Sequence, residues 1–289
     1  MSRTDDILDA IVLAGGRISG PYAATAKTEI KGLVPIRGAP VIDQILQALT
    51  EAPDIDRVCV VGPREVRDAS TLADVWTKDE GSPVESLRAG IESLGSTTRR
   101  ILVCSCDLPF ASCNAIRQMI HSAPFDAEIA VPVISDWDYA RSFPGASQSF
   151  IKLRDATITL GEVAIIDSRI VTSNLRLLAR VFSARKSPIA MACLLGMGFT
   201  SRLYSGRVTL ADIEVRASQV TQCKCRLIPH CSPVLAYDVN TLRDYVDARR
   251  RMRRRRPSRS TTSKAANDDA FDVQVVWGAG HEAEICHGN

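Results

Sequence analysis

Residues 10–17 read Ala-Ile-Val-Leu-Ala-Gly-Gly-Arg, and this stretch decides how the chain folds. Its first half is a short, continuous apolar run, which predicts a buried strand, and the glycine pair Gly15-Gly16 stops that strand in a tight loop. Three later runs have the same character, at residues 57–62, 100–106 and 127–133. Continuous rather than alternating apolarity is typical of strands covered on both faces, as in a parallel sheet between layers of helices.

Amphipathic stretches separate these runs. Residues 40–50 place Val41, Ile42, Ile45, Leu46 and Leu49 on one stripe, and residues 83–94 and 112–121 also have helical character. Strand and helix in alternation predict an α/β fold with a mostly parallel sheet and right-handed crossovers. After Trp137 the alternation of strand and helix stops, and a C-terminal elaboration follows that either extends the same sheet or forms a lid. There we expect a hairpin, two helices, a last strand and a closing helix, at residues 150–160, 168–184, 187–196, 223–228 and 240–250.

The composition excludes disorder of the whole chain, because 45% of the 289 residues are apolar and 24% are charged. The longest apolar stretch, residues 189–199, is well short of the ~20 residues of a bilayer-spanning helix. Residues 1–6 lack the basic and then apolar pattern of a leader. We therefore expect a cytoplasmic protein with no membrane partner. The cysteines of residues 223–231 lack zinc-finger spacing, so we expect thiols packed in the core.

Charge is concentrated near the C-terminus. From Arg249 to the end there are nine basic residues against five acidic ones, and the first part of that segment has almost nothing apolar to bury. This predicts a domain of residues 1–250 followed by a basic, disordered tail of residues 251–289. An arginine-rich run can bind nucleic acid, but a solvated helix extension is its commoner meaning, so we do not expect a nucleic-acid partner.

Polar residues that follow the strands are the candidates for chemistry, since ligands of open α/β sheets bind at the carboxyl ends of the strands. Gly15 and Gly16 let the backbone turn its N–H groups toward an anion. Asp107 is either a helix cap or a ligand for a hard cation such as Mg²⁺, and Ser112 is closer to the helix start. Asp238 is either a second ligand or part of a turn, with Asn240 as the cap of the closing helix.

Five short motifs occur in an order that resembles a known family. They are Leu13-Ala-Gly-Gly-Arg17, Lys31-Gly-Leu-Val-Pro-Ile-Arg-Gly-Ala-Pro40, Gly81-Ser-Pro-Val-Glu-Ser-Leu-Arg-Ala-Gly90, Cys106-Asp-Leu-Pro109 and Asp238-Val-Asn-Thr241. Together they resemble the MobA-like nucleotidyltransferases, which are related to molybdenum cofactor guanylyltransferases and to sugar-phosphate nucleotidyltransferases. The resemblance implies a Rossmann-like, GT-A-like nucleotidyltransferase fold. It also implies a Mg²⁺-dependent enzyme that transfers a nucleoside monophosphate from a nucleoside triphosphate (NTP) to a phosphorylated acceptor and releases pyrophosphate.

The resemblance also implies roles for particular residues. In the family, the loop at Leu13, Ala14, Gly15, Gly16 and Arg17 and the lysine that follows it hold the NTP. That lysine corresponds to Lys31, with Lys27 as its nearby competitor, and the aspartates at the positions of Asp107 and Asp238 bind Mg²⁺. Lys31 and Asp107 are thus the expected catalytic residues.

The chain departs from the family pattern in two places. Arg17 follows the glycines at once, and residues 18–30 form a longer, different loop. Where many relatives have a base-contacting Asn, this chain has Glu85-Ser86, so Ser86 is the nucleotide-binding candidate there and no base preference is carried over. Arg185 and Lys186 are either a solvated helix start or an acceptor-binding pair.

Other functions remain open from the sequence. The same fold serves sugar-1-phosphate and cytidylyl transferases, so the acceptor and the base are undecided. A nucleotide-binding regulator that has kept the pocket and lost turnover is the alternative from a different class, and a nucleic-acid-binding protein acting through its arginine tail is a third.

Overall fold

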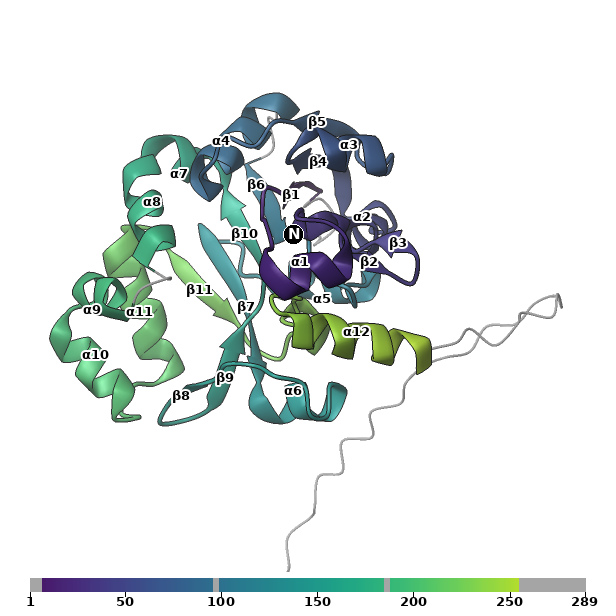
Figure 1. The fold of residues 1–289 in the computed structure, drawn as a ribbon. Helices are drawn as coiled ribbons and strands as arrows, with labels where there is room; N and C mark the ends of the chain where they lie inside the picture. Colours follow the sequence, from purple (N-terminus) through teal and green to yellow (C-terminus); the bar gives the residue numbers. More distant parts are fainter. Residues whose placement is uncertain (1–6, 96–98, 185–187, 255–289) are drawn as a thin grey trace, which may run out of the picture. The chain divides into compact units, whose positions relative to one another are not determined.

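A nine-stranded sheet lies at the centre of the computed structural model, which describes residues 7–95, 99–184 and 188–254 (Figure 1). In spatial order its strands are β5 (Val75–Thr77), β4 (Ile55–Val61), β1 (Leu8–Leu13), β6 (Arg100–Ser105), β10 (Val163–Asp167), β7 (Ile129–Ser135), β9 (Thr157–Leu160) and β8 (Ile151–Lys152), with β11 (Cys225–Ile228) paired to β7. The four buried strands expected from apolar runs are confirmed as β1, β4, β6 and β7.

The first half of the sheet is parallel. Ala10 of β1 pairs with Val58 on one side and with Leu102 on the other. β10 then runs antiparallel to both β6 and β7, so β6 and β7 point the same way, and β11 is parallel to β7. The mostly parallel α/β sheet is therefore confirmed, with two reversed strands: β10 near its middle and β9, which is antiparallel to β7, toward its edge.

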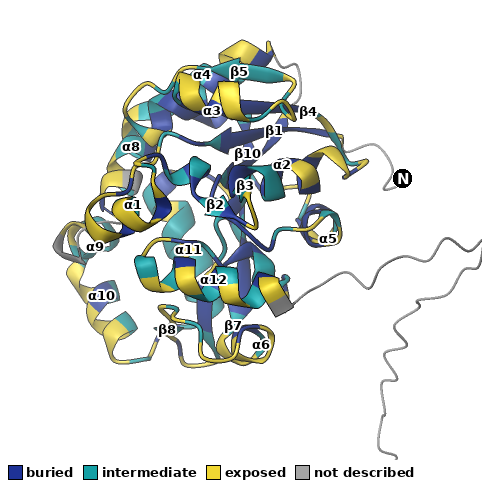
Figure 2. Ribbon diagram, turned by 45° about the vertical axis from the view of Figure 1, so that its right-hand side comes forward, coloured by how far each residue is buried: buried dark blue, intermediate teal, exposed yellow. Residues whose placement is uncertain are grey.

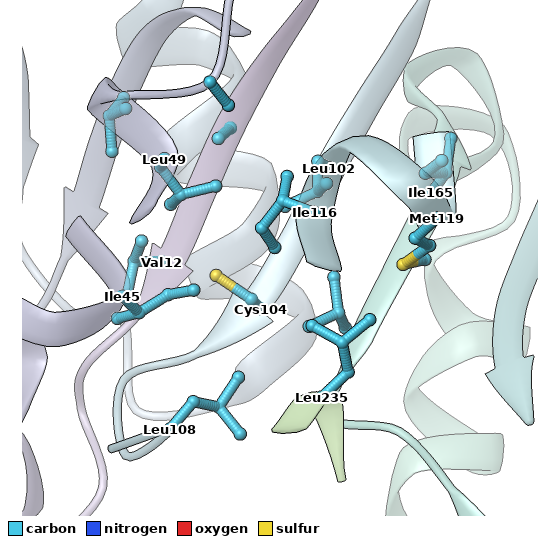
Figure 3. Close-up of a cluster of buried hydrophobic side chains, with 14 of the residues drawn as sticks. Val12, Ile45, Leu49, Leu102, Cys104, Leu108, Ile116, Met119, Ile165 and Leu235 are labelled. Atoms are coloured by element: carbon cyan, nitrogen blue, oxygen red, sulfur yellow. The ribbon is translucent and has the colours of Figure 1, made fainter. Parts of the chain in front are cut away.

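Helices cover both faces of the sheet. One face carries α2 (Ile42–Thr50) and α5 (Cys113–Ser122), and the other carries α4 (Pro83–Leu94), α7 (Ser168–Ser173) and α8 (Leu175–Ala184). Figure 3 shows Ile45 of α2 beside Val12 of β1, and Met119 of α5 beside Ile165 of β10, all of them buried in one cluster. Burying a side chain of this size contributes about 1.5–3 kcal/mol, so these two layers hold the sheet.

Further helices and strands complete the described chain. They are α1 (Gly20–Ala26), η1 (Lys31–Leu33), β2 (Pro35–Ile36), β3 (Ala39–Pro40), α3 (Arg64–Ala69), α6 (Asp136–Ser142), α9 (Pro188–Leu195), α10 (Met197–Tyr204), α11 (Leu210–Thr221), η2 (Pro233–Leu235) and α12 (Leu242–Arg254). The C-terminal elaboration extends the same sheet, because β10, β9, β8 and β11 all join it. Helices α10 and α11 pack on Val133, Leu153 and Ile158 at its far edge.

Three details differ from the sequence-based expectations. The helix expected at residues 168–184 is two helices, which meet at Asn174. Asn240 does not cap α12, because Thr241 does: the Asp244 N–H donates to Thr241 Oγ1 over 3.2 Å, and Asp244 accepts the Thr241 N–H over 2.9 Å. Helix α12 continues past Arg250 to Arg254, and the tail from residue 255 lies outside the described residues.

Burial follows the layers. Figure 2 shows buried residues along the central strands and exposed residues on the outer sides of the helices. The thiols of Cys223, Cys225 and Cys231 are buried, as expected for core cysteines. No helix in the described ranges is long and apolar enough to cross a bilayer.

Candidate active site

The loop after β1 presents three consecutive backbone donors. The Ala14 N–H, just before these donors, donates to the Val61 carbonyl oxygen over 2.7 Å, and Ala14 is buried. The loop closes on itself further along, where the Lys31 N–H donates to the Gly16 carbonyl oxygen over 2.9 Å. Between these two backbone hydrogen bonds, the N–H groups of Gly15, Gly16 and Arg17 donate to no acceptor in the part of the chain that the structure describes. Such a run of free N–H groups suits an anion, and we call residues 15–17 the anion loop.

A carboxylate lies directly against the anion loop. A Cβ added at Gly15 would fall 2.5–2.7 Å from three atoms of the Asp79 carboxyl group, so only glycine leaves room for it. Ser86 holds that carboxylate: its hydroxyl donates to Asp79 Oδ1 over 2.6 Å and accepts the Glu80 N–H over 3.1 Å. Ser86 is 2% exposed, so it acts on the loop through Asp79 and has almost no open surface of its own.

Asp107 follows β6 and is almost wholly buried, with 1% of its side chain exposed. Its Oδ1 accepts the Ser105 hydroxyl, and its Oδ2 accepts the Val239 N–H at 3.1 Å. It is not the cap of α5, because the Ser112 hydroxyl accepts the Ala115 N–H there. Two donors fix this buried carboxylate in position, and a buried charge is normally paired with a cation.

Lys31 supplies that cation. Its Nζ lies 2.6 Å from Asp107 Oδ2 and also donates to Asn240 Oδ1. Burial lowers the pKa of Lys31, but the neighbouring Asp107 outweighs burial and leaves the pKa above its ordinary value. Lys31 is therefore an ammonium ion at neutral pH. Lys27 is exposed at the end of α1 and has no bond to this cluster, so the structure places only one of the two lysines in the site.

Asp238 completes the cluster. Its Oδ2 accepts the side-chain amide of Asn240, whose oxygen is bound by Lys31. Burial and the charges of Asp107 and Glu162 raise the pKa of Asp238 to about 7, against the opposite effects of Lys31 and Asn240. The two aspartates therefore lie within electrostatic reach and repel one another.

This donor set fits a divalent cation. Carboxylate oxygens are the hard ligands that Mg²⁺ takes from proteins, commonly one or two of them, with substrate phosphates and water supplying the rest. Asp107 and Asp238 are such a pair, and a bound cation would offset the repulsion between their negative charges. Within the described residues no cluster of three or more His, Cys, Asp or Glu side chains is placed to hold a metal ion, so the protein would supply two carboxylates and no cage.

The loop that departs from the family pattern forms a helix packed against the site. Tyr22 of α1 packs against Tyr245 of α12 with the two rings tilted by 35° and their centroids 5.6 Å apart, and its hydroxyl donates to the Val239 carbonyl oxygen over 3.4 Å. Val239 is also the residue whose N–H binds Asp107. Helices α1 and α12 therefore support the segment that carries Asp238.

The structure brings together most of the residues singled out in the sequence. The anion loop, Lys31, Asp107 and Asp238 gather at the carboxyl ends of β1 and β6. Ser86 lies behind Asp79, while Arg185 and Lys186 lie outside the described residues. Sequence reasoning missed Asp79 and Glu162. The only sequence signal for Asp79 is weak: it lies two residues before the Gly-Ser-Pro with which a helix begins. Glu162 could have been found only by recognising that β10 follows it.

A parallel α/β sheet with a glycine loop after its first strand, and a lysine bound to an aspartate after a neighbouring strand, defines a nucleotidyltransferase fold. The family of MobA-like NTP transferase domains matches residues 10–190, and the chain belongs to this family.

Solved structures agree with this assignment. A hypothetical transferase from Thermus thermophilus is 29% identical, with a TM-score of 0.73 over 82% of this chain and 99% of that one. A nucleotidyl transferase from Methanothermobacter is 18% identical (TM-score 0.54; 86% of this chain, 99% of that one), and a CMP:2-keto-3-deoxy-manno-octonic acid synthetase complexed with CTP is 12% identical (TM-score 0.57; 86% and 98%). These two show a shared fold. A comparison with curated proteins gave no match.

Proposed function

We propose that this protein is a Mg²⁺-dependent nucleotidyltransferase that joins the nucleoside monophosphate of an NTP to a phosphorylated acceptor and releases pyrophosphate. The observation that carries the proposal is the juxtaposition of Lys31 with Asp107 and, through Asn240, with Asp238, next to the free N–H groups of the anion loop. Fixed donors, an ammonium ion and two carboxylates are the groups that phosphoryl chemistry needs in one place.

The anion loop and Lys31 would bind the triphosphate. Three backbone N–H groups could donate to phosphate oxygens without rearrangement, because the Ala14 and Lys31 backbone bonds already hold the loop at both ends. The Lys31 ammonium lies beside this loop and would offset the negative charge that repels an incoming acceptor phosphate.

Asp107 and Asp238 would hold the cation. When bound, Mg²⁺ neutralises phosphate charge and orients the reacting groups. The Ser105 hydroxyl and the Val239 N–H keep the Asp107 carboxylate in one orientation, which lowers the cost of assembling the site. Asn240 links Lys31 to Asp238, so the positive and negative groups are positioned as one unit.

The direct test is pyrophosphate release from each of the four NTPs, with a panel of phosphorylated acceptors, in Mg²⁺ and in excess chelator. We expect release with one NTP and one acceptor class, and none in chelator. Binding of an NTP without release under any condition would instead support the nucleotide-binding regulator. A sugar-1-phosphate as the productive acceptor would place the protein with the sugar nucleotidyltransferases.

Two variants test the site itself. Asp107→Asn keeps the volume of the side chain and removes its charge, so it should leave the fold intact and abolish Mg²⁺-dependent release. Lys31→Met should lower release by about 10²–10³-fold, the usual effect of losing one fixed group that stabilises a transition state. Lys27→Met is the matched control, since Lys27 is exposed and outside the cluster. Wild-type release by Asp107→Asn, or equal losses at the two lysines, would contradict the assignment.

A further inference from the structure

The Lys31 ammonium is bound directly to one of the two aspartates and is linked to the other through Asn240. It donates to Asp107 Oδ2 and to Asn240 Oδ1, and Asn240 in turn donates to Asp238. An ammonium has three donors, so two of the three are used on this cluster. Only 17% of the Lys31 side chain is exposed, so the contact is not one of many surface arrangements of a mobile lysine.

Asp107 has little capacity left while Lys31 is in place. A carboxylate offers about four lone-pair positions. The Ser105 hydroxyl uses Oδ1, and the Lys31 ammonium and the Val239 N–H both use Oδ2. A cation that binds Asp107 without nucleotide must therefore displace the ammonium, share Oδ2 with it or take the one remaining position on Oδ1 of the same carboxylate, and two positive charges so close together repel one another.

The Lys31 ammonium has a second position within its reach, beside the anion loop. Its stem runs along the anion loop, since a Cβ added at Gly16 would lie 3.4 Å from Lys31 Cδ. The lysine side chain is a flexible stem with a compact charge at its end, so rotation about its outer bonds moves the ammonium from Asp107 toward an anion on the loop.

We propose that Lys31 is the resident counter-ion of Asp107 and Asp238, which keeps a divalent cation out of the empty site until the phosphates of a nucleotide draw the ammonium away. Metal and nucleotide then bind cooperatively, because each binds better once the other has changed the position of Lys31. The inference rests on the proposed function, since it takes Asp107 and Asp238 as the metal-binding pair.

The experiment measures Mn²⁺ binding in the absence of nucleotide, by electron paramagnetic resonance or calorimetry, on the full chain. Lys31→Met removes the charge and keeps the length of the side chain. We expect it to bind Mn²⁺ at least tenfold more tightly than the wild type, equivalent to about 1.4 kcal/mol. Lys31→Gln, a second neutral replacement, should show the same gain, which guards against a folding defect in one variant. Lys27→Met should bind Mn²⁺ as the wild type does.

The location of the gained metal is tested by Asp107→Asn combined with Lys31→Met. The gain should disappear in the double variant. A gain that persists would mean that Mn²⁺ binds elsewhere, and it would overturn the inference. Folded Lys31 variants that bind Mn²⁺ no better than the wild type would overturn it as well.

These outcomes separate the inference from the proposed function. If the wild type releases pyrophosphate with Mg²⁺ but the neutral variants gain no affinity for Mn²⁺, the counter-ion role is wrong and the activity stands. If the variants gain affinity that depends on Asp107 but the wild type turns over no NTP under any condition, the counter-ion role is right and the activity is wrong.

Discussion

Replacing Gly15 with alanine inserts a methyl group where the Asp79 carboxyl group lies. The added Cβ would be 2.5 Å from Asp79 Cγ, about 1 Å inside an ordinary contact. Gly15 is not among the described glycines with positive φ, so the backbone itself accepts alanine. The carboxylate must therefore move and leave the Ser86 hydroxyl, which it accepts at 2.6 Å. Losing a hydrogen bond to a charged group costs about 1.5–3 kcal/mol, and the stiffer unfolded chain returns about 0.4–1 kcal/mol.

We thus expect Gly15→Ala to lower the free energy of unfolding by about 1–2 kcal/mol, measured by urea denaturation. Gly16→Ala is the matched control, because its Cβ would meet only the flexible stem of Lys31 at 3.4 Å. The change there should stay within about 0.5 kcal/mol. Asp79→Ala should remove the clash, so in the double variant Gly15→Ala should cost little more than Asp79→Ala alone. Equal effects at the two glycines, or full additivity with Asp79→Ala, would refute the placement of Asp79 against the loop.

Three further outcomes follow from the structure. Burial opposes the charge of Asp167, yet hydrogen bonds from two arginines hold its pKa at about 2. Asp167→Asn should therefore cost about 2 kcal/mol at pH 7 in urea denaturation, and this deficit should shrink as the pH falls from about 4 to 2, because the wild-type carboxylate becomes protonated over that range and is half protonated at about pH 2. Tyr22→Ala should lower the free energy of unfolding by about 3 kcal/mol, because Tyr22 is only 6% exposed, whereas Tyr22→Phe should lower it by no more than about 1 kcal/mol. Similar losses in the two variants would show that the hydrogen bond to Val239 matters more than the packing of the ring. A chain ending after Arg254 should melt within a few degrees of the parent and keep NTP turnover, and an inactive or insoluble product would move the domain boundary.

The four central strands with long apolar runs were predictable because they are buried on both faces. Such strands appear as unbroken apolar runs, so β1, β4, β6 and β7 could be recognised without knowing their neighbours. β10 is equally apolar, but it is short and lies between a hairpin and a helix, so nothing local distinguishes it. Its place between β6 and β7 depends on tertiary pairing, which a reading of neighbouring residues does not capture.

The candidate site was predictable where a local pattern or a family motif marks a residue, and not elsewhere. Asp107 follows a buried strand directly, and Lys31 precedes a motif. Asp79 is held beside the anion loop by its hydrogen bond from Ser86. Glu162 precedes β10, and the pairing of that strand brings it close enough to raise the pKa of Asp238. Neither proximity has a counterpart in sequence spacing, because both arise from how the sheet is assembled.

The late position of β10 in the chain has a consequence for synthesis on the ribosome. One side of β6 pairs with β1, which has already been made, but its other side waits for Val163, which follows Ser105 by 58 residues. At about 5–20 residues per second, the unpaired edge of a buried apolar strand is open for roughly 3–12 s. Open strand edges recruit other chains. Slower translation across residues 106–162 should therefore reduce the yield of soluble protein, although it changes no residue of the product.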